Sequence, residues 1–230
     1  MLVRGDGLNK SDKISRFDLF FYQFPPFNSL PMKQLGILIF DDVEVLDFAG
    51  PFEVFSVANQ LSGYKLLEVH TFSQTTLPIR ARNGLQVVPD HSITSIPTLD
   101  YLVLPGGDGT KKIIQNGPFI EQINQQILSS EWTMSVCSGS RILGKAGFLE
   151  HKPYCTHHEV FESMTSLVPT GIPKPTHRFI QSDTGIWTAA GISAGIDLAL
   201  HLTEITFGKE LALATAKYME YTPYLDLHAR

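Results

Sequence analysis

The residue best suited to chemistry is Cys137, which lies where an apolar, strand-like run over residues 133–136 meets a helical pattern through the small residues 138–140. A side chain at such a junction is presented on a tight, strained turn, a nucleophile elbow. The amides and dipole of the following helix favour a thiolate, so the sequence predicts a lowered pKa for the Cys137 thiol and a nucleophilic role. The alternative is that Cys137 is a small buried hydrophobic residue.

A carboxylate that could assist this thiol is Asp47, which has apolar neighbours on both sides. Such surroundings would desolvate the carboxylate and raise its pKa toward a value useful for acid–base catalysis. The alternative is a helix cap, because Asp47 lies near the expected start of a helix.

A glycine-rich segment, Leu104-Pro-Gly-Gly107, follows another predicted strand and would let the backbone approach a ligand closely. The amides of Gly107 and Ser138 are predicted to hold a developing negative charge together. An ordinary glycine turn is the alternative. The segment is not a phosphate loop, since it lacks the Gly-Lys-Ser/Thr ending.

Two adjacent histidines, His157 and His158, point in different directions on any regular element, so no shared metal is expected. His157 is a candidate general base for Cys137, with a structural histidine as the alternative. The only other cysteine, Cys155, is interpreted as structural, and its pairing with Cys137 stays open. No metal or other cofactor is predicted.

Strand-like and helical patterns alternate along the chain, and the strands and helices that they predict must position these residues. This order predicts an α/β fold, with a mainly parallel sheet and helices on both faces. Ligands of such folds bind beyond the carboxyl ends of the strands, where Cys137 and the glycine segment lie. The predicted strands cover residues 35–40, 64–72, 85–88, 101–104, 133–136, 178–181 and 187–189, and the predicted helices cover 50–61, 119–128, 138–146, 194–207 and 210–218.

The length of 230 residues fits one domain, which we place at residues 34–230. Residues 1–33 show no sustained period and are interpreted as an extension that lacks fixed structure or is an artefact of the gene model. Because Met32 immediately precedes the domain, translation is expected to start there.

Composition and charge restrict the class of function. A net charge of −5 disfavours nucleic-acid binding, and no run reaches the roughly twenty apolar residues of a membrane span. The two cysteines make no disulfide framework, which favours a reducing, cytoplasmic location. A small-molecule substrate is therefore expected.

Several motifs, taken in chain order, resemble the ThiJ/PfpI family of the class I glutamine amidotransferase-like superfamily, and within it the isonitrile hydratase branch. The resemblance implies a flavodoxin-like sandwich, Cys137 as nucleophile and Asp47 as its partner. It extends from about residue 35 to residue 224. The matching segments are residues 36–40, 46–55, 104–107, 135–140, 143–149, 156–157 and 189–200.

This branch implies a cofactor-independent enzyme that adds water to a small isonitrile and releases an N-substituted formamide. Gly107, Ser138 and His157 would bind the substrate, and a homodimer is expected. Two positions depart from the branch: Ser138 stands where threonine is usual, and His158 where tryptophan is common. Serine keeps the hydroxyl but is less rigid, and His158 would reshape the rim of the pocket.

Three other functions remain open. A glyoxalase-like or hydrolase activity could use the same cysteine, although such relatives generally pair it with glutamate, whereas this chain has Asp47. A non-catalytic ligand-sensing module is the second, since related domains are fused to AraC-type regulators. The third is a redox sensor whose thiol is oxidised to a sulfinic acid.

Overall fold

The computed structural model describes residues 31–223 and has one central seven-stranded sheet. Its strands are β1 (Lys33–Leu38), β2 (Leu67–Ser73), β5 (His91–Ser92), β6 (Tyr101–Leu104), β7 (Trp132–Val136), β10 (Phe179–Asp183) and β11 (Ile186–Ala189). They lie in the order β10-β11-β7-β6-β1-β2-β5. All neighbours pair in parallel except β10 and β11, which are antiparallel.

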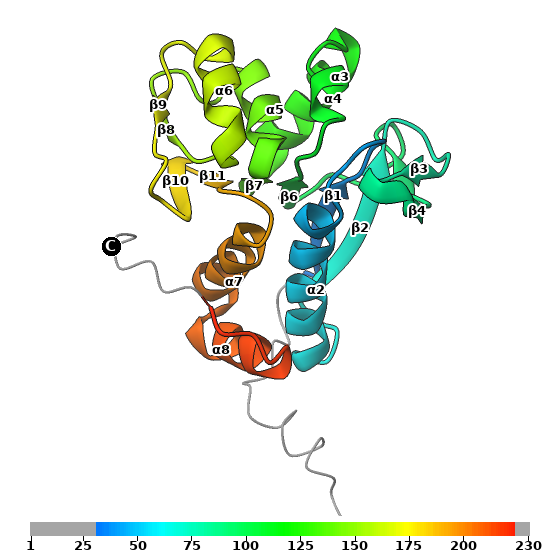
Figure 1. Ribbon diagram of the computed structural model, residues 1–230. Helices are drawn as coiled ribbons and strands as arrows, with labels where there is room; N and C mark the ends of the chain where they lie inside the picture. Colours follow the sequence, from blue (N-terminus) through cyan, green and yellow to red (C-terminus); the bar gives the residue numbers. More distant parts are fainter. Residues whose placement is uncertain (1–30, 224–230) are drawn as a thin grey trace, which may run out of the picture.

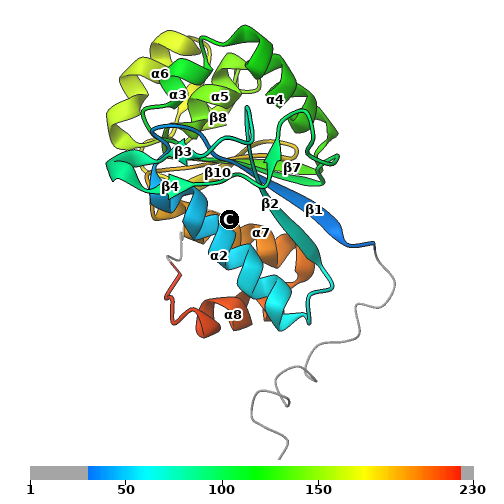
Figure 2. The same cartoon turned by 90° about the vertical axis from the view of Figure 1, so that its right-hand side faces the viewer.

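Helices cover both faces of this sheet, as Figures 1 and 2 show. One face carries α2 (Val45–Leu61), α7 (Ala194–Phe207) and α8 (Lys209–Tyr218). The opposite face carries α3 (Thr110–Ile113), α4 (Gly117–Ser129), α5 (Ser140–Lys145) and α6 (Phe161–Leu167). The predicted α/β sandwich is therefore confirmed.

Small elements complete the fold at the ends of the sheet. Two short pairs, β3 (Ile79–Arg80) with β4 (Gln86–Val87) and β8 (Pro153–Tyr154) with β9 (Ile172–Pro173), lie outside the main sheet. Single 3₁₀ turns occur at Arg82–Gly84, Cys137–Gly139 and His158–Val160.

The continuous apolar runs of the sequence form the centre of the sheet. Every residue of β6 and β7 is buried, as expected for parallel strands covered on both faces. Beneath them α2 and α7 approach closely at Gly50, where a Cβ would lie 2.9 Å from Ile196 Cγ1. The sheet and the helices on both of its faces thus share one packed core.

The structure differs from the sequence expectation most at α2. The pattern predicted a helix from residue 50, because glycine and proline usually mark a boundary, but the helix begins at Val45 with Pro51 inside it. This earlier start places Asp47 in the first helical turn. The short elements α3, α6 and β5 were missed because they contain too few residues to show a period.

The sheet begins at Lys33, the last residue of the extension that the sequence predicts over residues 1–33. Residues 1–30 of that predicted extension lie outside the described residues, as do residues 224–230. Lys33 forms ion pairs with Asp100 and Glu131, which tie the start of β1 to the amino ends of β6 and β7. Within residues 31–223, no helix combines the length and the apolar character that crossing a membrane requires.

Candidate active site

Cys137 lies directly after β7, at the strained strand-to-helix turn that the sequence predicts. Its φ of 57° is in the left-handed region, which costs a non-glycine residue roughly 1–2 kcal/mol. Tertiary hydrogen bonds hold it there: the Cys137 N–H donates to Ala190 O (2.9 Å) and the Thr156 hydroxyl donates to the Cys137 carbonyl (3.0 Å). The residue is 7% exposed, so it is not fully sealed in the core.

Asp47 is fully buried and acts as no helix cap, since it occupies the first turn of α2 after Glu44. Its Oδ2 accepts a hydrogen bond from the Gly106 N–H at 2.9 Å. Within the described residues, Oδ1 is buried without a well-aligned donor. Burial raises the pKa of Asp47 to about 7, against the opposing effect of the Gly106 amide. Asp47 can therefore hold or release a proton near neutral pH.

The Cys137 thiol lies within interaction distance of the Asp47 carboxyl, so the two segments that carry them meet at one site. Burial raises the pKa of Cys137 to about 12, and the negative charge of Asp47 adds to this rise. The N–H groups of Ser138 and Ile192 oppose it only in part. The predicted lowering of the thiol pKa is therefore wrong: α5 is six residues long, and its dipole does not offset desolvation and a neighbouring carboxylate.

The predicted pairing of the Gly107 and Ser138 amides is also corrected. The Gly107 N–H donates to Ser138 Oγ (2.9 Å) rather than pointing with the Ser138 amide at one anion. The amides that face the sulfur belong to Ser138 and Ile192. Sequence reasoning missed Ile192, although it follows the carboxyl end of β11, where a parallel sheet places its functional loops.

His157 lies at the edge of this arrangement. Its ring packs against Gly191, where a Cβ would lie 2.5 Å from His157 Cδ2, and its Nδ1 accepts the Glu159 N–H at 3.3 Å. Among residues 31–223, His157 makes no hydrogen bond with Cys137 or Asp47. The structure thus places His157 beside Gly191, next to Ile192, while its side chain caps the 3₁₀ turn at His158–Val160.

Gly106 lacks a side chain, which allows its backbone to lie close to both Ser138 and Asp47. A Cβ at this position would lie 2.6 Å from Ser138 N and 2.8 Å from Asp47 Oδ2. We expect Gly106→Ala to destabilise the protein by about 1–3 kcal/mol and to displace the Asp47 carboxyl. Thermal unfolding and mass-spectrometric labelling of Cys137 measure the two effects.

The matched control is Gly117→Ala at the start of α4, where a Cβ would meet nothing within 4 Å. This substitution should leave both the unfolding temperature and Cys137 labelling near those of the unaltered protein. An unchanged Gly106→Ala protein would show that the close approach to Ser138 and Asp47 is not required.

No disulfide joins Cys137 to Cys155 in the described structure. Cys155 is fully buried, and its thiol lies 3.7 Å from the Lys174 carbonyl oxygen. It serves the packing of the core, as the sequence suggests.

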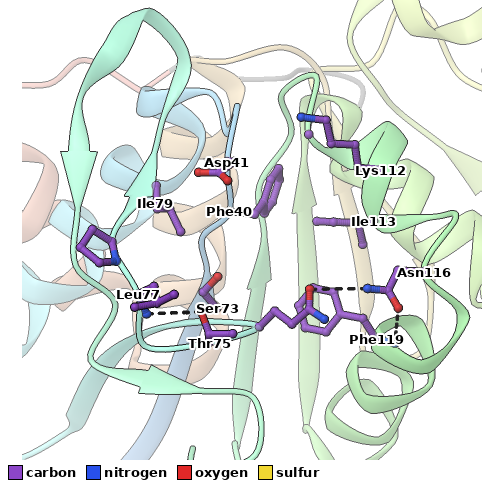
Figure 3. A pocket seen from close by; sticks show the side chains of 13 residues that line it. Phe40, Asp41, Ser73, Thr75, Leu77, Ile79, Lys112, Ile113, Asn116 and Phe119 are labelled. Atoms are coloured by element: carbon purple, nitrogen blue, oxygen red, sulfur yellow. Dashed lines mark hydrogen bonds between the residues drawn. The ribbon is translucent and has the colours of Figure 1, made fainter.

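A separate cavity of about 330 Å³ opens beyond the ends of β1 and β2 (Figure 3). Phe40, Ile79 and Ile113 form apolar parts of its wall, and Asp41 and Lys112 lie at its upper part in this view. Neither Cys137 nor Asp47 lines it. None of the residues predicted from the sequence to act on substrate lies in this cavity.

The chain resembles several known proteins in sequence and in structure. A model of the DJ-1/PfpI family matches residues 33–205. The chain is 32% identical to isonitrile hydratase of Pseudomonas putida over 190 residues, 83% of this chain and 79% of that protein. It is 29% identical to the HTH-type transcriptional regulator GbdR of Pseudomonas aeruginosa over 197 residues, 86% of this chain but 53% of the regulator. The chain thus spans about half the length of that relative.

A solved structure of a ThiJ/PfpI family protein from Pseudomonas syringae has the same fold. Its TM-score is 0.76 at 25% sequence identity, and the match covers 90% of this chain and 83% of that chain. The relatives include an enzyme and a regulator, so function must be argued from the site itself.

Proposed function

This chain belongs to the DJ-1/PfpI family, and from that premise we propose that it is a cysteine enzyme that hydrates a small isonitrile to an N-substituted formamide. The observation that carries the proposal is the buried Asp47 carboxyl beside Cys137, with a pKa of about 7. The reaction needs a nucleophile for the isonitrile carbon and a group that delivers a proton to the adduct. Cys137 and Asp47 supply these two functions.

In the first step the proton of the Cys137 thiol passes to Asp47, and the thiolate sulfur bonds to the terminal carbon of R–N≡C. Protonated Asp47 then delivers its proton to that carbon, which gives the thioimidate R–N=CH–S–Cys. Oδ1 of Asp47, which accepts no backbone donor within the described residues, can carry this proton, because Oδ2 accepts the Gly106 N–H. The Ser138 and Ile192 amides stabilise negative charge on the sulfur during the transfer.

In the second step the Asp47 carboxylate takes a proton from water, and the hydroxide bonds to the thioimidate carbon. The nitrogen receives the proton from Asp47, the C–S bond breaks, and R–NH–CHO leaves. The sulfur departs as thiol, with the proton that the new hydroxyl group loses. One water is consumed, and the Cys137–Asp47 pair returns to its starting state with a single proton.

The aspartate favours this reaction over a glyoxalase-like one, because glyoxalase-like relatives generally pair the cysteine with glutamate. The test compares cyclohexyl isocyanide with methylglyoxal on the purified protein, with mass spectrometry of the products. We expect N-cyclohexylformamide to form and methylglyoxal to be left unchanged. Methylglyoxal turnover without formamide formation would overturn the proposal.

The pKa values of the pair predict the pH dependence. Below the Asp47 pKa of about 7 both groups are protonated, whereas between about 7 and about 12 the pair holds the single proton that the reaction uses. We expect kcat/KM for an uncharged isonitrile to fall as the pH drops below about 7, approaching tenfold per pH unit. Steady-state rates across this range measure it, and a profile that rises toward acid pH would contradict the assignment.

A further inference from the structure

The turn over residues 190–193, between β11 and α7, contacts the segment that carries the reacting sulfur. The Cys137 N–H donates to the Ala190 carbonyl at 2.9 Å, and the Ile192 N–H is one of the two amides that face the sulfur. Ile192 has a φ of 44°, in the left-handed region, which is unusual for a β-branched residue. Such a conformation persists only where the surrounding structure holds it. The contacts that hold Ile192 therefore bear on the proposed reaction.

Arg178, the residue before β10, is bonded to both ends of this turn. Its carbonyl oxygen accepts the Ala190 N–H at 2.9 Å, which fixes the first residue of the turn. Its guanidinium fixes the last residue, because Nη2 donates to Ser193 Oγ at 3.0 Å. Arg178 thus spans the turn, with its backbone at one end and its side chain at the other.

Ser193 occupies the N-cap position of α7, where a serine hydroxyl usually accepts an N–H of the first helical turn. Within the described residues, its side chain makes no such capping hydrogen bond. The hydroxyl accepts the Arg178 guanidinium instead. The Ser193 side chain therefore ties the turn to Arg178 rather than closing the end of the helix.

A buried carboxylate fixes the orientation of the guanidinium. Asp197, in the first turn of α7, has a side chain that is 1% exposed, and its Oδ2 accepts Arg178 Nε at 2.7 Å. The Tyr221 hydroxyl donates to the other oxygen, Oδ1, at 3.0 Å. Charge-assisted hydrogen bonds are shorter and stronger than neutral ones. The Nη2 group of Arg178 is therefore held in place toward Ser193.

We propose that Arg178 is a positioning residue of the site, which holds the turn over residues 190–193 so that the Ile192 N–H faces the Cys137 sulfur. This inference rests on the proposed role of Cys137 as nucleophile. The Ile192 amide favours the thiolate, whereas the charge of the neighbouring Asp47 carboxylate opposes it. A displaced turn would therefore leave less thiolate for the reaction.

The test measures alkylation of Cys137 by iodoacetamide at one pH below the thiol pKa, with peptide mass spectrometry to separate Cys137 from Cys155. Ser193→Ala removes the hydroxyl that Arg178 binds and leaves the Arg178–Asp197 ion pair in place. We expect alkylation to slow about tenfold, because the thiolate fraction falls when an amide donor is lost. Ser193→Thr keeps the hydroxyl and should retain most of the rate.

The direction of the change separates positioning from other roles of the turn. If the turn only covered the sulfur, its release in Ser193→Ala would expose Cys137 and speed alkylation. If the turn only stabilised the fold, the unfolding temperature would fall and the alkylation rate would stay unchanged. Either result, in a protein whose folding is verified by circular dichroism, overturns the inference.

A second variant tests whether Arg178 acts through Ser193. Arg178→Lys keeps a positive charge beside the buried Asp197, but one ammonium replaces the two nitrogens that bind Asp197 and Ser193. We expect this variant to slow alkylation, and the double variant with Ser193→Ala to be no slower, because both changes remove the same contact. Additive losses would refute the link. If Arg178→Lys does not fold, the comparison of Ser193→Ala with Ser193→Thr still decides.

The matched control is Lys152→Met, which removes an exposed ion pair with Asp183 at the other end of β10. It should leave the alkylation rate unchanged, because this pair lies at the end of the strand away from Arg178.

Alkylation requires no isonitrile, so the two proposals fail in different ways. Slower alkylation of Ser193→Ala in a protein that forms no formamide supports the positioning role and refutes the hydratase reaction. Formamide production together with an unchanged alkylation rate in Ser193→Ala refutes the positioning role alone.

Discussion

Cys137→Ala should reduce formamide production to the uncatalysed background, a loss of more than about a thousandfold. In the proposed reaction the sulfur is the atom that bonds to the isonitrile carbon, and alanine keeps the backbone turn while removing it. Asp47 alone could at most activate water, without a covalent intermediate. Product formation measured by mass spectrometry, together with circular dichroism to verify folding, gives the result.

The control for this variant is Cys155→Ala. Cys155 is equally buried, but its thiol contacts the Lys174 carbonyl rather than Asp47. Its removal should lower the unfolding temperature through a small cavity and leave turnover intact. Formamide production that survives in folded Cys137→Ala would sink the covalent mechanism.

Asp47→Asn should lower kcat by about a hundredfold to ten-thousandfold, the usual contribution of a positioned acid–base group. The amide oxygen of asparagine can still accept the Gly106 N–H, so the substitution changes the proton and not the shape. The variant can neither take the proton of the thiol nor deliver one to the adduct. Steady-state kinetics with an isonitrile measures the effect, and unchanged kcat would exclude Asp47 from proton transfer.

The same variant should become more stable than the unaltered protein as the pH rises. Burial raises the pKa of folded Asp47 to about 7, above its ordinary value, so the folded state binds this proton more tightly than the unfolded state. The stabilisation is fully present below the unfolded pKa and is lost as the pH rises through about 7, at up to roughly 1.4 kcal/mol per pH unit. Asparagine cannot ionise and avoids this loss.

Thermal unfolding of both proteins from about pH 4 to pH 8 tests this expectation, because the difference in stability should grow across the window. Asp183→Asn is the control, because the pKa of Asp183 is shifted in the opposite direction to that of Asp47. Asp183 is an exposed carboxylate whose pKa is lowered by hydrogen bonds from Lys152 and the Thr184 amide. Its asparagine variant should gain nothing in this range. Parallel stability curves for Asp47→Asn and the unaltered protein would mean that ionisation of Asp47 does not destabilise the folded state.

Much of the fold could be predicted from the sequence, because its determinants are local. Continuous apolar runs separated by helical patterns specify a parallel sheet covered on both faces, and they place Cys137 and the glycine segment at its carboxyl edge. The resemblance to a family added Asp47 as partner of the cysteine. Elements of two to seven residues, such as α3 and α6, escaped prediction because their segments are too short to show a period.

By itself, the sequence determined that a cysteine would follow β7 on a tight turn and that a carboxylate would follow β1. Only the tertiary structure decided their electrostatics. The sign of the Cys137 pKa shift, the Ile192 amide that reaches the sulfur and the partners of the Arg178 guanidinium all depend on contacts between segments distant in the chain. The physical reason is that a residue type and its neighbours set backbone geometry, whereas burial and charge balance are set by everything that packs around the site.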